Sequence, residues 1–166
     1  IFKTELYQTY ASKNNENINK SKENEQTHKK KIYLIFEYQK HAEVIPLSEW
    51  LIKQGFEVIL TSTDISKKEV IQTHKQHLIT SDAVLIYYHS QDNPSWFKTK
   101  LQELLKSPGF GKKRPFDAKA VYIKDKLNLD YFEMLDDFEI IENPKPSKPE
   151  LLVPFIEKII NTQQPK

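Results

Sequence analysis

The stretch that decides the fold is SDAVLIYYH, residues Ser81–His89, whose one acidic residue stands near its start. A run of this length is too short for an independent helix and too apolar for a strand with one face in water. Pro, Asn and Asp residues follow it in QDNPSW (Gln91–Trp96), as expected after a strand. We therefore predict the central strand of a parallel sheet. Ligands of such sheets bind beyond the carboxyl ends of the strands, so His89–Trp96 is the first place to look for function.

Further apolar runs predict an alternation of strands and helices along the rest of the chain. The predicted strands are Ile32–Phe36, Phe56–Leu60, Ala83–Tyr88, Ala118–Ile123 and Phe138–Glu142. Helical spacing predicts one helix that ends at Gly55 and others over Lys67–Thr80, from a Ser95 cap to Ser107, and over Glu150–Asn161. Such alternation predicts a parallel sheet with helices on both faces and right-handed crossovers. The fold class is α/β, a flavodoxin-like sheet of five strands in the order 2-1-3-4-5.

Residue usage divides the chain into four parts. We expect residues 1–11 to be a short amphipathic element or the end of a preceding region, and residues 12–31 are almost wholly Asn, Lys, Glu, Ser and Gln. Such a composition buries too little apolar surface to offset the entropy of ordering, so we predict a flexible linker. The α/β domain is residues 32–161, followed by a tail, 162–166. Because the first residue is Ile1 rather than Met, we expect another domain of the same protein before it.

The overall composition excludes several classes of protein. A length of 166 residues, with 38% hydrophobic and 29% charged residues, suits one soluble domain. The net charge of +2 gives no reason to expect nucleic-acid binding. No apolar segment approaches the roughly 20 residues that a membrane span needs. The chain has no cysteine, which excludes disulfides and thiolate chemistry and fits a reducing cytoplasm.

The motifs for phosphate and metal binding give one candidate. With only three glycines, the chain has neither a GxGxxG motif nor a P-loop. The segment GFGKKRP, however, places flexible backbone beside Lys112, Lys113 and Arg114, which could form an anion cradle or simply a basic surface turn. Among the five histidines only His74 and His77 share a predicted helix, without an HExxH context, so we predict no metal site.

The order of these motifs resembles a bacterial TIR-like (Toll/interleukin-1 receptor homology) domain. The similarity covers about Lys30 to Asn161 and rests on YLIFEYQ, on GFEVIL with its polar loop, and on SDAVLIYY followed by PSWF. Together, DAVLIYY, WFKTKLQEL, PGFGKKRP and AKAVYI resemble the subset found in bacterial multidomain proteins of conflict and signalling type. The resemblance implies a TIR-like three-layer sandwich, self-association through this domain, and a role in signal transduction or antiviral defence.

The resemblance also bears on catalysis. TIR enzymes cleave the nicotinamide–ribose bond of NAD with a glutamate four residues beyond the tryptophan, and here that position is Lys100. A lysine has the wrong charge to stabilise a developing ribosyl cation. The nearest acid is Glu103, one helical turn further on roughly the same face. The loop after the second strand, Thr61–Ser66, lacks the glycine that the family carries.

Three functions stay open on the sequence alone. The first is a weakly catalytic or inactive signalling module that self-associates or binds a nucleotide-like ligand. The second is an NAD hydrolase that uses Glu103, and the third is an interaction scaffold without a ligand. NAD or a related nucleotide is the ligand or substrate that the resemblance implies, and the residues expected to contact it are Glu37, Tyr38, Asp64, His89, Trp96 and Lys100.

Overall fold

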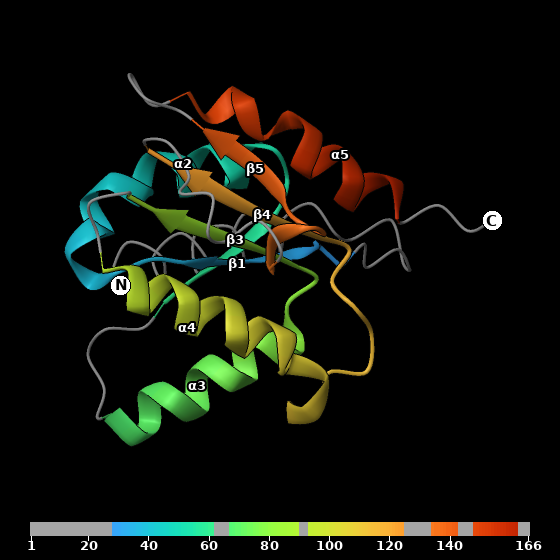
Figure 1. Ribbon diagram of the computed structural model, residues 1–166. Helices are drawn as coiled ribbons and strands as arrows, with labels where there is room; N and C mark the ends of the chain where they lie inside the picture. The colour runs from blue at the N-terminus through green and yellow to red at the C-terminus, as the bar shows by residue number, and fades with distance from the viewer. Residues whose placement is uncertain (1–27, 62–66, 90–92, 125–133, 143–147, 163–166) are drawn as a thin grey trace, which may run out of the picture.

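The structure, a computed structural model, describes residues 28–61, 67–89, 93–124, 134–142 and 148–162. Within these ranges one sheet contains β1 (Lys31–Ile35), β2 (Glu57–Leu60), β3 (Ala83–Tyr88), β4 (Ala118–Ile123) and β5 (Glu139–Glu142). The strand order is β2-β1-β3-β4-β5, and all neighbouring strands are parallel (Figure 1). The predicted α/β class, strand order and central position of β3 are confirmed.

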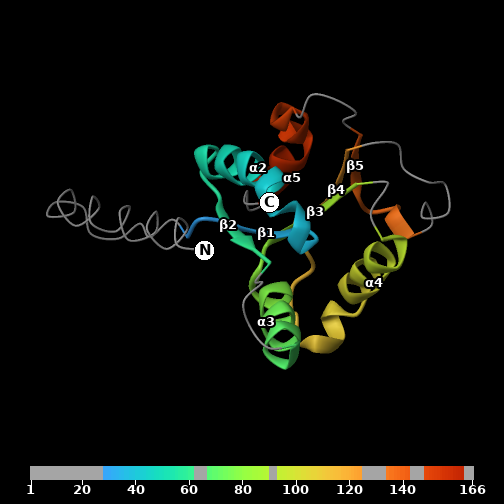
Figure 2. The same ribbon diagram turned by 90° about the vertical axis from the view of Figure 1, so that its left-hand side faces the viewer.

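Helices cover both faces of the sheet, as predicted. The α-helices in the described residues are α2 (His41–Lys53), α3 (Lys67–Thr80), α4 (Pro94–Leu105) and α5 (Val153–Asn161). Short 3-10 helices, η1 (Tyr38–Lys40), η2 (Ser107–Phe110) and η4 (Pro149–Leu152), adjoin three of them. Figures 1 and 2 show α2 and α5 on one face, and α3 and α4 on the other. The result is the predicted three-layer sandwich.

The two faces of β3 explain why its sequence is apolar throughout. All six residues are buried, and Leu85 and Tyr87 pack in the core beneath α2 and α5. Val84, Ile86 and Tyr88 point to the opposite face and pack in the core formed with α3 and α4. A strand with both faces covered has no position for a polar side chain. The four-residue strands β2 and β5 lie at the edges of the sheet.

Several predicted boundaries were wrong by a residue. β1 begins at Lys31, which we had placed in the linker, because its N–H donates to Asp82 Oδ2 at 2.8 Å. β1 ends one residue early, and β2 and β5 begin one residue late. The last predicted helix is divided into η4 and α5, with Pro154 in the first turn of α5, where its missing N–H costs little.

The cap of α4 was also predicted wrongly. The cap is Asn93, whose Oδ1 accepts the N–H of Ser95 at 3.0 Å, and Pro94 is the first helical residue. Ser95 therefore already lies inside the first turn, which is the usual position of residues after an N1 proline. The helical spacing of apolar residues also predicts Ile71 of α3 and Leu105 of α4 on the buried faces, but these residues are 57% and 61% exposed. Consecutive helical residues are about 100° apart, so Leu105 points away from the core although the residue before it is buried.

Candidate functional site

The structure distributes the predicted site residues over three places. Glu37, Tyr38, His89 and Trp96 lie at the carboxyl edge of the sheet, where β1 and β3 end and α4 begins. Lys100 and Glu103 lie further along α4, on the side of α3. The basic segment of Lys112, Lys113 and Arg114 precedes β4 and therefore lies at the opposite, amino edge. Asp64 lies outside the described residues. The sequence prediction thus combined residues from separate places.

At the carboxyl edge, the structure assembles a polar cluster that the sequence analysis missed. Tyr87 at the end of β3 donates its hydroxyl to Glu43 Oε2 at 2.6 Å. Lys124, which follows β4, has its Nζ 3.4 Å from the same oxygen, and Lys40 Nζ lies 3.8 Å from Glu43 Oε1. We call Lys40, Glu43, Tyr87 and Lys124 the carboxyl-edge cluster. Its members come from η1, α2, and the ends of β3 and β4.

Glu43 is the central acid of the carboxyl-edge cluster. The hydrogen bond from Tyr87, together with the charges of Lys124 and Lys40, outweighs burial and holds the pKa of Glu43 below its usual range. The carboxyl group is therefore ionised at neutral pH. The cluster lies where the order of strands reverses between β1 and β3, which is the usual ligand site of such sheets. An acid in the first turn of the helix after β1 was the available sequence signal.

The predicted site residues around this cluster differ in solvent exposure and in their hydrogen-bond partners. Tyr38 is 67% exposed. Glu37 is half-buried, and its Oε1 has no hydrogen-bond partner in the described residues. Trp96 is also half-buried and packs against the core under α3 and α4, although its place at the start of the apolar face of α4 predicts a fully buried indole. The described residues thus offer an exposed aromatic ring and a carboxylate at this edge.

The second polar group lies between α3, α4 and the sheet. Tyr33 of β1 has its hydroxyl 2.7 Å from His74 Nδ1, and His74 Nε2 lies 2.6 Å from Glu103 Oε2. Lys100 Nζ donates to the same Glu103 oxygen at 3.0 Å. We call Tyr33, His74, Lys100 and Glu103 the inner polar network. It links β1, α3 and α4 through one chain of contacts.

The charge state of the inner polar network follows from its surroundings. Burial alone would raise the pKa of Glu103, but the contact with His74 and the charge of Lys100 outweigh it and lower this pKa. Burial raises the pKa of the fully buried Tyr33 phenol, which therefore stays neutral. Glu103 is thus an ionised carboxylate whose Oε2 already contacts two side chains. It lies in the last turn of α4, whereas α4 begins at the carboxyl edge (Figure 1).

Comparison with known proteins identifies the fold. No protein-family model matches the sequence, and no curated protein is significantly similar to it. The crystal structure of the RPS4 and RRS1 TIR domain heterodimer matches with a TM-score of 0.56 and 16% identity, over 81% of this chain and 96% of that chain. The fold is similar to that of a TIR domain.

A second solved structure is similar to this chain, with a lower TM-score. It is a pilus assembly-related protein from Burkholderia pseudomallei K96243, with a TM-score of 0.50 and 11% identity over 85% of this chain and 96% of that chain. At such identities the similarity shows the fold alone. The TIR-like architecture predicted from the sequence is therefore confirmed, whereas function has to be argued from the residues of this chain.

Two further properties concern metals and membranes. Within the part of the chain that the structure describes, no group of three or more His, Asp or Glu side chains is arranged to hold a metal ion. None of the described helices is long and apolar enough to cross a bilayer.

Proposed function

We propose that this chain is a TIR-like interaction module of a bacterial signalling or defence protein, which self-associates or binds a nucleotide-like ligand and does not cleave NAD efficiently. The observation that carries the proposal is the position of Glu103. Its Oε2 lies 2.6 Å from His74 Nε2 and 3.0 Å from Lys100 Nζ. The acid nearest to the expected catalytic position is therefore a member of the inner polar network.

The chemistry of NAD cleavage explains why this position matters. A carboxylate that stabilises a developing ribosyl cation has to face the sugar without a competing positive charge. Here the side chain four residues after Trp96 is the cation Lys100, and it neutralises Glu103 instead. Glu103 would have to lose both contacts before it could meet a substrate. We therefore expect the domain to bind a nucleotide-like ligand without cleaving NAD.

The carboxyl-edge cluster supports a nucleotide-like ligand. Two cations, Lys40 and Lys124, lie beside Glu43 in this cluster, and an ammonium group can also bind a phosphate oxygen. Tyr38 is exposed beside it and offers a ring on which a base could stack. These features lie at the edge where doubly wound sheets bind ligands.

Exposed apolar side chains support self-association. Among the described large apolar residues that are exposed, Ile52, Leu151, Val153 and Ile160 lie in the layer of α2, η4 and α5. Val153 and Ile160 are seven residues apart and share one face of α5. The matching TIR structure is a heterodimer of two such domains. A second copy of this chain is the partner that we propose for this layer.

One experiment tests catalysis and a second tests association. The full chain is incubated with NAD, in solution and crowded on a multivalent support, and nicotinamide is measured by chromatography. We expect no release above a protein-free blank. Robust release that disappears in Glu103→Gln would establish the hydrolase instead, and release unaffected by Glu103→Gln would place the active centre elsewhere.

Association is tested by sedimentation. Ile160→Glu should convert a dimer of this chain to monomer, whereas Ile71→Glu on the other layer should leave the dimer unchanged.

A further inference from the structure

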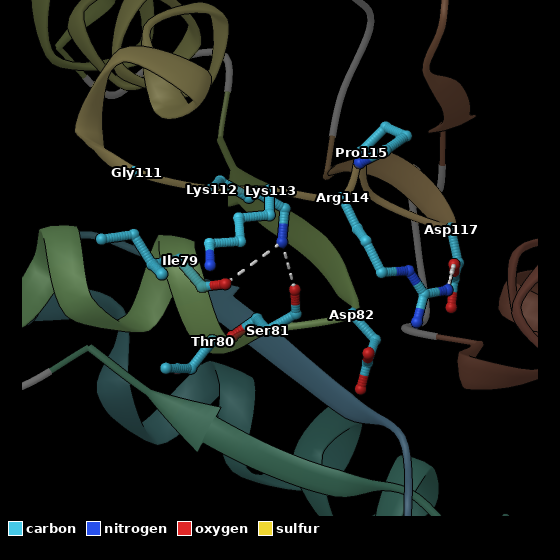
Figure 3. A pocket seen from close by; sticks show the side chains of 10 residues that line it. All are labelled: Ile79, Thr80, Ser81, Asp82, Gly111, Lys112, Lys113, Arg114, Pro115 and Asp117. Carbon is cyan, nitrogen blue, oxygen red and sulfur yellow. Dashed lines mark hydrogen bonds and ion pairs between the residues drawn. The ribbon is translucent and has the colours of Figure 1, made fainter.

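A pocket opens at the amino edge of the sheet, opposite the carboxyl-edge cluster. It has a volume of about 300 Å³ and lies between the end of α3 with the start of β3 and the segment before β4. Figure 3 shows the residues that line it, among which Ser81, Asp82, Lys112, Lys113, Arg114 and Asp117 carry the polar groups. We call it the amino-edge pocket. It contains the basic segment that the sequence marked as a possible anion cradle.

Lys112 has a structural role in this pocket. Its Nζ donates to Ser81 O at 2.7 Å and to Ile79 O at 3.4 Å, two carbonyls at the end of α3 (Figure 3). A cation at the carboxyl end of a helix satisfies carbonyls that lack intrahelical partners. Lys112 also lies 4.2 Å from the centre of the Phe116 ring. Of the three cations in the basic segment, Lys112 is thus held at the end of α3 by its own contacts.

Lys113 and Arg114 are the cations left available. Lys113 is exposed and has no ion-pair partner in the described residues. Arg114 Nη2 lies 3.8 Å from Asp117 Oδ1, a long contact, and its side chain is 73% exposed. Each carboxylate of the pocket has another partner, because Asp117 Oδ2 pairs with Lys30 Nζ at 2.7 Å and Asp82 Oδ2 accepts the N–H of Lys31. A positive charge at the mouth of the pocket is the result.

Ser81 provides an independent indication of a ligand. The residue is 2% exposed, and its Oγ has no hydrogen-bond partner within the described chain. A buried hydroxyl without a hydrogen-bond partner destabilises the folded state, so natural proteins rarely keep one without a purpose. Oxygen atoms of a bound ligand would accept its hydrogen bond.

We propose that the amino-edge pocket binds the phosphate group of a small molecule, with Arg114 and Lys113 on its oxygens and the Ser81 hydroxyl donating to the ligand. The planar guanidinium group suits the tetrahedral oxygens of phosphate, and the ammonium adds a second charge. The volume of about 300 Å³ exceeds the size of a phosphate ion and leaves space for a sugar. A nucleoside monophosphate is therefore the preferred class of ligand. This inference does not depend on the proposed function, which concerns the opposite edge.

Calorimetric titration of the full chain at low salt tests the proposal, with AMP and inorganic phosphate as the probes. We expect saturable binding of AMP, competition by inorganic phosphate, and affinity at least about tenfold weaker in the double variant Lys113→Ala/Arg114→Ala. Lys98→Ala removes an exposed cation from α4 at the other edge and should leave the affinity unchanged. Absence of saturable AMP binding, or equal affinity in the double variant, would overturn the proposal.

Ser81→Ala separates a ligand contact from a structural role. If the hydroxyl serves the ligand, this variant should bind AMP about three- to tenfold more weakly. Its thermal stability without ligand should be unchanged or higher, because the variant no longer buries an unsatisfied hydroxyl. An unchanged AMP affinity combined with a lower melting temperature would assign Ser81 a purely structural role and contradict this part of the proposal. Neither readout involves NAD cleavage, and loss of AMP affinity in Lys113→Ala/Arg114→Ala distinguishes binding in the amino-edge pocket from binding at the carboxyl-edge cluster.

Discussion

His74 Nε2 lies 2.6 Å from Glu103 Oε2, and this contact joins α3 to α4 beneath the sheet. The other ring nitrogen, Nδ1, lies 2.7 Å from the hydroxyl of Tyr33 in β1. The His74 ring therefore lies between a phenol of β1 and a carboxylate of α4, with one ring nitrogen toward each. The inner polar network therefore fixes the position of both helices relative to the sheet.

Glu103→Gln should lower the free energy of unfolding by about 1–3 kcal/mol, because it leaves His74 and Lys100 without their anionic partner. The folded-state pKa of Glu103 lies below its ordinary value of 4.5, so its contribution is present above that value and is lost as the pH falls below it. Urea unfolding at several pH values measures both effects. Glu49→Gln, on the exposed face of α2, is the matched control. A variant as stable as the wild type would contradict a structural role for the network.

His77 gives stability a second dependence on pH. Burial first, and then the charge of His74, lower the pKa of His77 from 6.5. As the pH falls through 6.5, the unfolded chain takes up a proton before the folded protein does, so stability should decrease below this pH. His77→Gln should flatten the stability profile over this range, whereas the exposed His28→Gln should leave it unchanged. Identical profiles in wild type and His77→Gln would show the assignment to be wrong.

Trp96 and Phe97 differ in burial, so their replacement by alanine should destabilise the protein to different extents. Phe97 is fully buried and stacks on Tyr88 with ring centres 4.2 Å apart, so Phe97→Ala should cost about 3–5 kcal/mol. Trp96 is only half-buried, and Trp96→Ala should cost about 1–3 kcal/mol. Thermal or urea unfolding gives the comparison. If loss of Trp96 leaves stability unchanged, the indole is available as a stacking surface for a ligand.

Asn93→Ala tests the start of α4. Removing the side chain that accepts the Ser95 N–H should destabilise the protein by about 1 kcal/mol. Ser95→Ala should change stability by less than about 0.5 kcal/mol, because Ser95 is exposed and lies within the first turn. If Ser95→Ala destabilised the protein more than Asn93→Ala, Ser95 would be the N-cap.

The sheet was predicted well from the sequence because buried strand positions are occupied by apolar residues. β3 is apolar on both faces and β4 is apolar except at Lys119, and the bounds of both were predicted to the residue. The start of β1 was missed because a single long-range contact decides it, the hydrogen bond of Lys31 N–H to Asp82. The residue type of Lys31 does not indicate that its N–H has a partner 51 residues away.

The candidate site was harder to predict because it depends on how elements far apart in the chain meet. Glu43 belongs to a helix, and its importance follows only from Tyr87 and Lys124, which lie 44 and 81 residues away. Lys112 looked available in sequence but donates to carbonyls at the end of α3. The pairing of Glu103 with His74 likewise requires the packing of α3 on α4.

The central position of β3 has a consequence for how this chain folds. β3 pairs with β1 and β4, and the contact of Lys31 with Asp82 at the start of the β1–β3 pair spans 51 residues. No two strands of the sheet can pair without first closing a long loop, so we expect folding over milliseconds or longer. Until β4 is available, one side of β3 offers a row of unpaired backbone groups beside Leu85, Ile86 and Tyr87. A nascent or truncated chain that ends before β4 would therefore be prone to aggregate through this strand.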